Sequence, residues 1–112
     1  MKNIDIKVVR DFHPKPYGRY PNDGDGCGQI FREKILAKAL RAHDKVHVDL
    51  NGYNRYGRSF LDEAFGGLIR ESGFSGKEVK KKLTYSHDLV KSIELLIAER
   101  IDAAIRDYEQ NA

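Results

Sequence analysis

The chain has 112 residues, with 20 Lys and Arg against 17 Asp and Glu and a single cysteine. This length predicts one domain spanning residues 1–112, and 40% apolar with 33% charged residues predicts a folded core rather than disorder. A lone cysteine excludes an internal disulfide. The net charge of +3 permits an acidic partner, but it is small for a nucleic-acid-binding protein.

Hydropathy along the chain predicts a cytoplasmic protein with no membrane partner. No stretch approaches the roughly 20 apolar residues that a membrane span needs. The first six residues alternate polar with apolar side chains, unlike the apolar core of a signal peptide.

Periodicity in the first half of the chain predicts a strand, a long loop and a helix. Alternating apolar residues predict a half-buried strand over residues 4–8. Residues 10–28 hold all three prolines and four glycines, which is typical of a functional or mobile loop. Apolar residues at spacings of three and four then predict a helix over residues 29–43.

The second half begins with the clearest strand, residues 45–50. Its alternate residues Lys45, His47 and Asp49 are polar, so one face of the sheet is expected to be only partly covered. The remaining elements predict a small mixed β-sheet backed by helices, in the α/β class. In chain order they are a turn over 51–57, a helix from Ser59, a short helix over 76–81 capped by Ser75, a strand over 82–85 and a helix over 87–109.

Ser59 directly precedes a predicted helix, with Asp62 three residues later. This spacing predicts an N-cap, in which the serine oxygen accepts a hydrogen bond from a free backbone N–H group. The same position also suits a phosphate, because free N–H groups and the helix dipole favour negative charge there. Arg55 and Arg58 would pair with that phosphate, so Ser59 is a candidate phosphoacceptor.

The glycine-rich run before the second helix does not match the known phosphate-binding loops. It lacks the Gly-Lys-Ser/Thr ending of a P-loop and the third glycine of a dinucleotide-binding loop. It also lacks the last carboxylate of a calcium-binding EF-hand. A bare anion or nucleotide site at the helix start stays open as an alternative, built from Arg19, Gly24, Gly26, Gly28 and Arg32.

Neither a metal site nor an enzyme active site is predicted, and no cofactor is expected. The four histidines lie on separate elements and Cys27 has no second thiol. Asp62 and Glu63 are adjacent in a helix, so they face different directions and cannot work as a paired acid and base. Lysines 77, 80, 81 and 82, with Tyr53 and Tyr56, have the residue types that hold single-stranded nucleic acid. A solvated face is the simpler interpretation, so a nucleic-acid partner is not expected.

The run Ser-Phe-Leu-Asp-Glu-Ala-Phe-Gly-Gly-Leu at 59–68, after the strand and turn at 46–52, resembles the STAS-like domain family of uncharacterised function. That bacterial group is related to anti-sigma-factor antagonists. Gly18-Arg19-Tyr20 and Phe31-Arg32-Glu33 are also similar to it, so the resemblance covers the chain from Gly18 to the last helix.

The resemblance implies a single STAS-like domain with a small sheet backed by helices. In anti-sigma-factor antagonists, a strand ending in Asp-Leu leads to a serine at the start of the next helix. A histidine-kinase-like ATPase phosphorylates this serine, and the phosphate breaks the complex. Ser59 matches that position.

The leading hypothesis is therefore a non-enzymatic signalling module that binds a histidine-kinase-like ATPase and is switched by phosphorylation of Ser59. Its docking surface is expected on the turn before Ser59 and on an exposed half of the helix over 61–69. The candidate partner-binding residues are Asp49, Asn51, Gly52, Tyr53, Arg55, Tyr56, Arg58, Asp62, Glu63, Gly66 and Gly67.

Overall fold

The computed structural model describes residues 2–109 and contains a three-stranded parallel sheet in the order β1-β2-β3. The strands are β1 (Asn3–Lys7), β2 (Lys45–Asp49) and β3 (Leu83–Ser86). The predicted α/β class is confirmed, but the sheet is entirely parallel rather than mixed. Each connection between strands passes through helices, which return the chain to the edge where the previous strand began.

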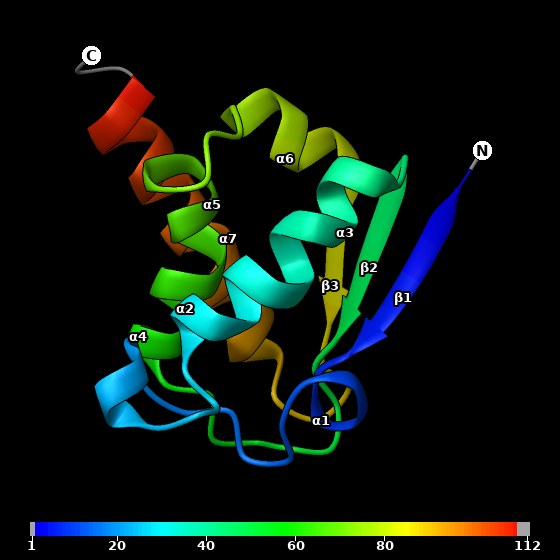
Figure 1. Cartoon of the computed structure of the whole chain (residues 1–112), viewed down its shortest axis with the longest axis vertical. Coiled ribbons are helices and arrows are strands. Elements are labelled where there is room, and N and C mark those ends of the chain that lie inside the picture. The colour runs from blue at the N-terminus through cyan, green and yellow to red at the C-terminus, as the bar shows by residue number, and fades with distance from the viewer. Residues whose placement is uncertain (1, 110–112) are drawn as a thin grey trace.

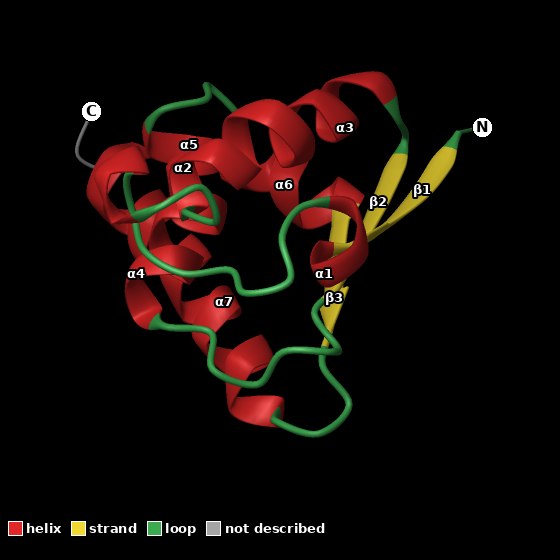
Figure 2. Ribbon diagram, turned by 60° about the horizontal axis from the view of Figure 1, so that its bottom comes forward, coloured by secondary structure: helices red, strands yellow, loops and turns green. Residues whose placement is uncertain are grey.

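The long helices lie together on one side of the sheet (Figures 1 and 2). Three of them contain a π-helical segment, so consecutive labels form one continuous helix, as α7 and η4 do in the last long helix. The first comprises α2, η2 and α3, and the second comprises α4, η3 and α5. In chain order the helical elements are α1 (Val8–Asp11), the 3-10 turn η1 (Pro21–Asp23), α2 (Gly28–Phe31), η2 (Arg32–Leu36), α3 (Ala37–Ala42), α4 (Arg58–Leu61), η3 (Asp62–Gly66), α5 (Gly67–Arg70), α6 (Gly76–Lys82), α7 (Lys91–Ala104) and η4 (Ile105–Glu109).

Aromatic side chains fill the space where the first two long helices meet. The Phe31 ring lies 5.9 Å from that of Phe60 and 6.5 Å from that of Phe65, measured between ring centroids. All three side chains are fully buried. Burying a side chain of this size stabilises the fold by about 1.5–3 kcal/mol, so this cluster holds the two long helices together.

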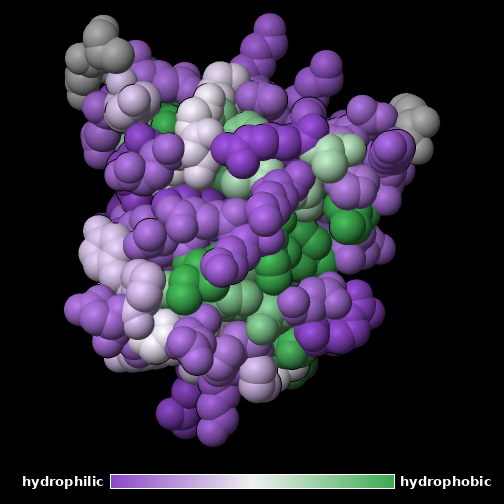
Figure 3. All heavy atoms as spheres, viewed as in Figure 1, coloured by the Kyte–Doolittle hydropathy of each residue, from purple (hydrophilic) through white to green (hydrophobic). Residues whose placement is uncertain are grey.

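The opposite face of the sheet is polar, as the alternation in β2 predicts. His47 lies at its centre, with Nδ1 2.7 Å from Thr84 Oγ1 and Nε2 2.9 Å from Ser86 Oγ. Lys7 pairs with Asp49 at 3.6 Å on the same face. On the face seen in Figure 1, charged and polar side chains also dominate, with an apolar band across the middle (Figure 3).

Three predicted helix starts are wrong by one to four residues. The first long helix begins at Gly28 rather than at residue 29. The second long helix begins at Arg58 with Gly57 as its N-cap, so Ser59 is its second residue and does not cap it. α7 begins at Lys91 rather than at residue 87. The buried ring of His87 accepts hydrogen bonds from the backbone N–H groups of Leu89 and Val90, which holds this segment in a turn. By contrast, Ser75 caps α6 as predicted, because its Oγ accepts a hydrogen bond from Glu78 N at 3.1 Å.

Replacing Gly67 with alanine is expected to destabilise the domain by about 1–3 kcal/mol, the range for overpacking. Glycine to alanine inside a helix normally stabilises by about 1 kcal/mol. Here the added methyl group overlaps the guanidinium group of Arg32, which contacts this glycine. Urea unfolding would measure the change.

A Gly57→Ser variant serves as the control, because no atom lies within 4 Å of the position of its Cβ. Serine is a good N-cap residue, so the expected gain is a few tenths of a kcal/mol. A Gly67→Ala protein more stable than the wild type would show that Arg32 moves away without cost.

Candidate functional site

The second long helix runs through the centre of the helical layer and meets solvent at its first turn and at its last residue, the half-buried Arg70. Residues 57–59 are exposed, whereas every residue from 60 to 69 is buried. The expected exposed half of this helix therefore does not exist. The reason is that α7 and the first long helix both pack against it. Among the candidate partner-binding residues, Asp62, Glu63, Gly66 and Gly67 are consequently inside the protein.

Four arginines from separate parts of the fold surround the Asp62–Glu63 pair at the start of η3. Asp62 Oδ2 lies 2.8 Å from Arg19 Nη1 and 3.2 Å from Arg70 Nη2. Its Oδ1 lies 3.4 Å from Arg100 Nη1. π-helical segments are frequent at functional sites. In this domain, however, η3 begins at Asp62 and Glu63, and arginine side chains neutralise both of these charges inside the protein.

Glu63 is bound more tightly and more deeply than Asp62. Arg32 Nη1 donates to Glu63 Oε2 at 2.6 Å and to the Glu63 carbonyl oxygen at 2.6 Å. Arg19 Nη1 reaches the other carboxylate oxygen at 3.2 Å. Both Arg32 and Glu63 are at least 95% buried, with residue exposures of 2% and 5%. The pair joins the two long helices, so its role is structural.

Both arginines of the predicted anion site, Arg19 and Arg32, belong to this cluster. The guanidinium groups of Arg19 and Arg32 face the two carboxylates. A Cβ at Gly28 would meet the Phe60 carbonyl oxygen at 2.6 Å, and one at Gly26 would meet His13 at 3.0 Å. These two glycines allow close packing, and the loop does not form an open phosphate cradle. Gly24 has free space around it.

Acid is expected to weaken the fold through the Asp62 cluster. Burial would raise the pKa of Asp62, but the hydrogen bonds and charges of Arg19 and Arg70 outweigh it and hold the pKa below its ordinary value. A carboxylate with a lowered folded-state pKa contributes stability above its unfolded pKa of about 4, and this stability is lost as the pH falls through the folded value. The melting temperature should therefore fall steeply below about pH 4.

An Asp62→Asn variant should have a lower melting temperature at neutral pH and a shallower fall in acid. Asp25→Asn is the matched control, since Asp25 is exposed and forms no hydrogen bond or ion pair with the described residues. Parallel acid profiles for Asp62→Asn and wild type would contradict the assignment.

Ser59 lies in a shallow pocket between the start of α4 and the proline- and glycine-rich loop. The pocket has a volume of about 280 Å³, and its other lining residues are Tyr17, Gly18, Asp23, Gly57, Arg58 and Phe60. Figure 2 shows this loop running from α1 at the end of the sheet to the start of α4. The structure therefore brings a loop distant in sequence to the predicted phosphoacceptor.

The turn between β2 and α4 is held by hydrogen bonds at both ends. Asp49 Oδ1 accepts from Asn51 N at 2.9 Å and from Asn51 Nδ2 at 2.8 Å, and these bonds together with Lys7 lower the pKa of Asp49 against the effect of burial. His87 Nε2 contacts the Tyr53 carbonyl oxygen at 2.9 Å. Tyr56 is buried with its ring 5.7 Å from that of Phe60, and burial raises its pKa.

The predicted partner-binding residues therefore do not form one patch. Asp49 and Asn51 lie at the end of the sheet, and the turn then crosses the molecule to α4 (Figure 1). Gly52, Arg55 and Arg58 are exposed. Within residues 2–109, neither of these two arginines forms an ion pair or a hydrogen bond.

The match to known families covers the central part of this arrangement. The sequence profile of the STAS-like domain of unknown function matches residues 27–88, from just before α2 to just after β3. The chain belongs to this family. Searches of curated proteins and of solved structures gave no match.

Two features of this STAS-like domain were missed by sequence reasoning. His87 is fully buried and connects the Tyr53 turn to the start of α7, which no local pattern indicates. Tyr17 is exposed beside Ser59. An aromatic residue between two prolines was the available signal for the second feature, because interfaces are enriched in tyrosine.

The described residues also bear on three other kinds of site, namely a metal site, a membrane span and a basic surface. Among the described residues, no group of three or more His, Cys, Asp or Glu side chains is placed to hold a metal ion. No helix within residues 2–109 is long and apolar enough to cross a bilayer. In the basic cluster, Lys80 pairs with Asp102 at 2.8 Å, and Lys82 Nζ donates to the Leu40 carbonyl oxygen at 2.9 Å.

Proposed function

We propose that this STAS-like domain is a non-enzymatic regulatory module that docks a histidine-kinase-like ATPase through the surface around Ser59, and that phosphorylation of Ser59 releases it. One observation carries the proposal. Ser59 is exposed in the first turn of a helix whose next ten residues are buried. A kinase can therefore reach the hydroxyl group, while the rest of the helix keeps it in a fixed position.

The chemistry around Ser59 suits a docking surface. Tyr17, Arg58 and the serine line one shallow pocket, and Arg55 lies exposed in the preceding turn. Tyrosine and arginine are among the residues most enriched at protein interfaces. Because both arginines are without ion-pair partners among the described residues, the surface favours a partner with acidic groups.

A phosphate on Ser59 would reverse this preference. It adds nearly two negative charges next to Arg58 and at the positive end of the helix. The arginines then have an internal partner, and the acidic groups of the ATPase meet a like charge. Phosphorylation thus removes the attraction that holds the complex while leaving the fold intact.

The test compares three variants of the tagged domain in co-purification from its own cells. Wild type and Ser59→Ala are expected to capture a histidine-kinase-like ATPase, whereas Ser59→Glu should capture at least about tenfold less, since each 1.4 kcal/mol of binding free energy is tenfold. Ser92→Glu is the matched control, because Ser92 is also the exposed second residue of a helix. Equal capture by Ser59→Glu and wild type, or capture of no such ATPase, would contradict the proposal.

A further inference from the structure

A cavity of about 270 Å³, open to solvent on one side, lies away from Ser59, between α6, β3 and α7. Val79, Leu83 and Ile101 form apolar walls and are almost fully buried. Ala98 forms part of the α7 side, where its single methyl group leaves the space between α7 and β3 unfilled. An enclosed apolar cavity of about 150 Å³ holds benzene, so this cavity has room for one six-membered ring and a short substituent.

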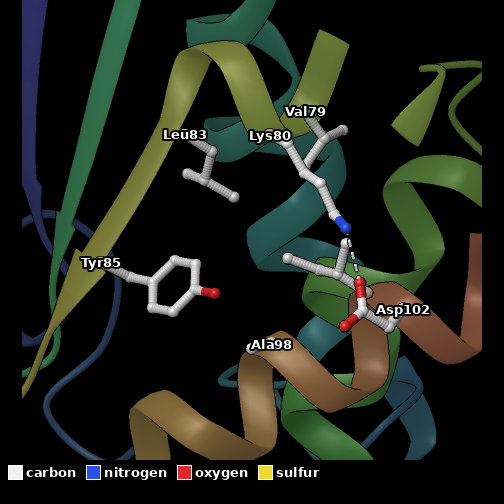
Figure 4. Close-up of a pocket in the computed structure, with 7 residues that line it drawn as sticks. Val79, Lys80, Leu83, Tyr85, Ala98 and Asp102 are labelled. Atoms are coloured by element: carbon white, nitrogen blue, oxygen red, sulfur yellow. Dashed lines mark ion pairs between the residues drawn. The ribbon is translucent and has the colours of Figure 1, made fainter. Parts of the chain in front are cut away.

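Two kinds of polar group meet at this cavity. The Tyr85 hydroxyl points from β3 toward the open space, and Lys80 and Asp102 approach each other across the opposite side (Figure 4). Lys80 Nζ lies 2.8 Å from Asp102 Oδ1. The Tyr85 hydroxyl forms no hydrogen bond with any residue in the described part of the chain. It is therefore free to bind a polar group placed inside the cavity.

The charges around Tyr85 favour a cationic ligand over an anionic one. Burial, and then the negative charges of Asp102 and Glu94, raise the pKa of the Tyr85 phenol. An anion placed at the hydroxyl would meet the same repulsion that the phenolate does. An ammonium group would be attracted by the same charges and would donate hydrogen bonds to the Asp102 carboxylate.

Lys80 is a replaceable occupant of the Asp102 site. The Lys80 side chain is 60% exposed and that of Asp102 is 51% exposed. Ion pairs this open to water contribute little to stability. A ligand ammonium group can therefore take the place of the lysine at low cost, while the apolar part of the ligand fills the cavity.

We infer that this cavity binds a small primary amine whose apolar part is about the size of one six-membered ring. The ammonium group pairs with Asp102 on one side of the cavity, and the ring contacts Leu83, Ala98 and Ile101 on the side of the Tyr85 hydroxyl. This site is separate from the Ser59 surface and does not depend on the function proposed for it.

The experiment titrates the domain with benzylamine, benzyl alcohol and benzoate, which share one ring and differ in charge, and follows backbone amide NMR shifts. Benzylamine is expected to saturate in the millimolar range, as is usual for so small a molecule. Its shifts should be confined to α6, β3 and α7. Benzyl alcohol should bind more weakly, and benzoate should not saturate. Absence of saturation by benzylamine, or equal binding of benzoate, overturns the inference.

Three variants assign the contacts. Ala98→Leu fills the cavity and should abolish benzylamine binding, and Asp102→Asn should weaken benzylamine while leaving benzyl alcohol unchanged. Lys80→Ala removes the competing ammonium group and should strengthen benzylamine binding about two- to fivefold. This factor corresponds to the small free energy that an exposed ion pair contributes. Lys77→Ala, on the same helix but outside the cavity, should change nothing. Weaker binding in Lys80→Ala, or unchanged binding in both Ala98→Leu and Asp102→Asn, counts against the site.

Discussion

Replacing Arg32 with methionine is expected to lower the free energy of unfolding by about 3–5 kcal/mol, the usual cost of removing one partner from a buried ion pair. Methionine fills much of the same space, so the loss comes mainly from the charge. Arg32 donates to both the side chain and the backbone of Glu63, and Glu63 is almost fully buried. Without Arg32, the cations of residues 2–109 that remain within 4 Å of that carboxylate are the more exposed Arg19 and Arg70.

Urea unfolding of three variants would test this expectation. Arg55→Met is the matched control, because Arg55 is exposed and unpaired within the described chain, and its stability should change by less than about 0.5 kcal/mol. The double variant Arg32→Met with Glu63→Leu should recover part of the loss, since no buried charge then lacks its partner. Equal losses for Arg32→Met and Arg55→Met would show that the pair contributes nothing to stability.

Replacing Phe31 with alanine is expected to destabilise the domain by about 3–5 kcal/mol. The Phe31 ring contacts the rings of Phe12, Phe60 and Phe65 and is fully buried, so its removal leaves a cavity where α2 meets the second long helix. A small domain has only about 5–15 kcal/mol of stability in total. The variant should therefore be largely unfolded or melt far below the wild type.

Circular dichroism melts would separate the effect of losing buried volume from the effect of losing an aromatic ring. The variants to compare are Phe31→Ala, Phe31→Leu and Tyr17→Ala. Leucine keeps most of the apolar volume and should cost less than alanine. The Tyr17 side chain is largely exposed, so its loss should change the melting temperature little. If Phe31→Ala melted within a few degrees of Tyr17→Ala, the aromatic cluster would not be the centre of the core.

The elements of the fold were predictable because their patterns are local. Alternating apolar residues identified β1 and β2, and the Ser75 capping sequence identified the start of α6. The direction of strand pairing was not predictable in the same way. It depends on how each helical connection packs against the sheet, and a mixed sheet was the wrong expectation.

The predicted site residues fall into two groups, those placed by local sequence and those placed by contacts with residues far away in the sequence. Ser59 was identified by its position at a helix start, which is a local property, and it is exposed there. Asp62 and Glu63 were predicted to bind a partner because half of the helix over 61–69 was expected to be exposed. Their burial depends on Arg19 and Arg100, which are far away in the sequence. Gly66 and Gly67 do permit a close approach, but arginine side chains of the same chain make it, rather than a partner protein.

The parallel pairing of the strands also constrains the order in which the chain folds. Asn3 pairs with Lys45 and Val46 pairs with Leu83, so each strand must find a partner about 40 residues away. Closing such long loops costs conformational entropy before any strand pairing can stabilise the chain. Contacts between residues far apart in the sequence therefore slow folding. The helices between the strands contain their own hydrogen bonds and need no such closure. Folding should thus start in the helical layer, and the sheet should assemble on it last.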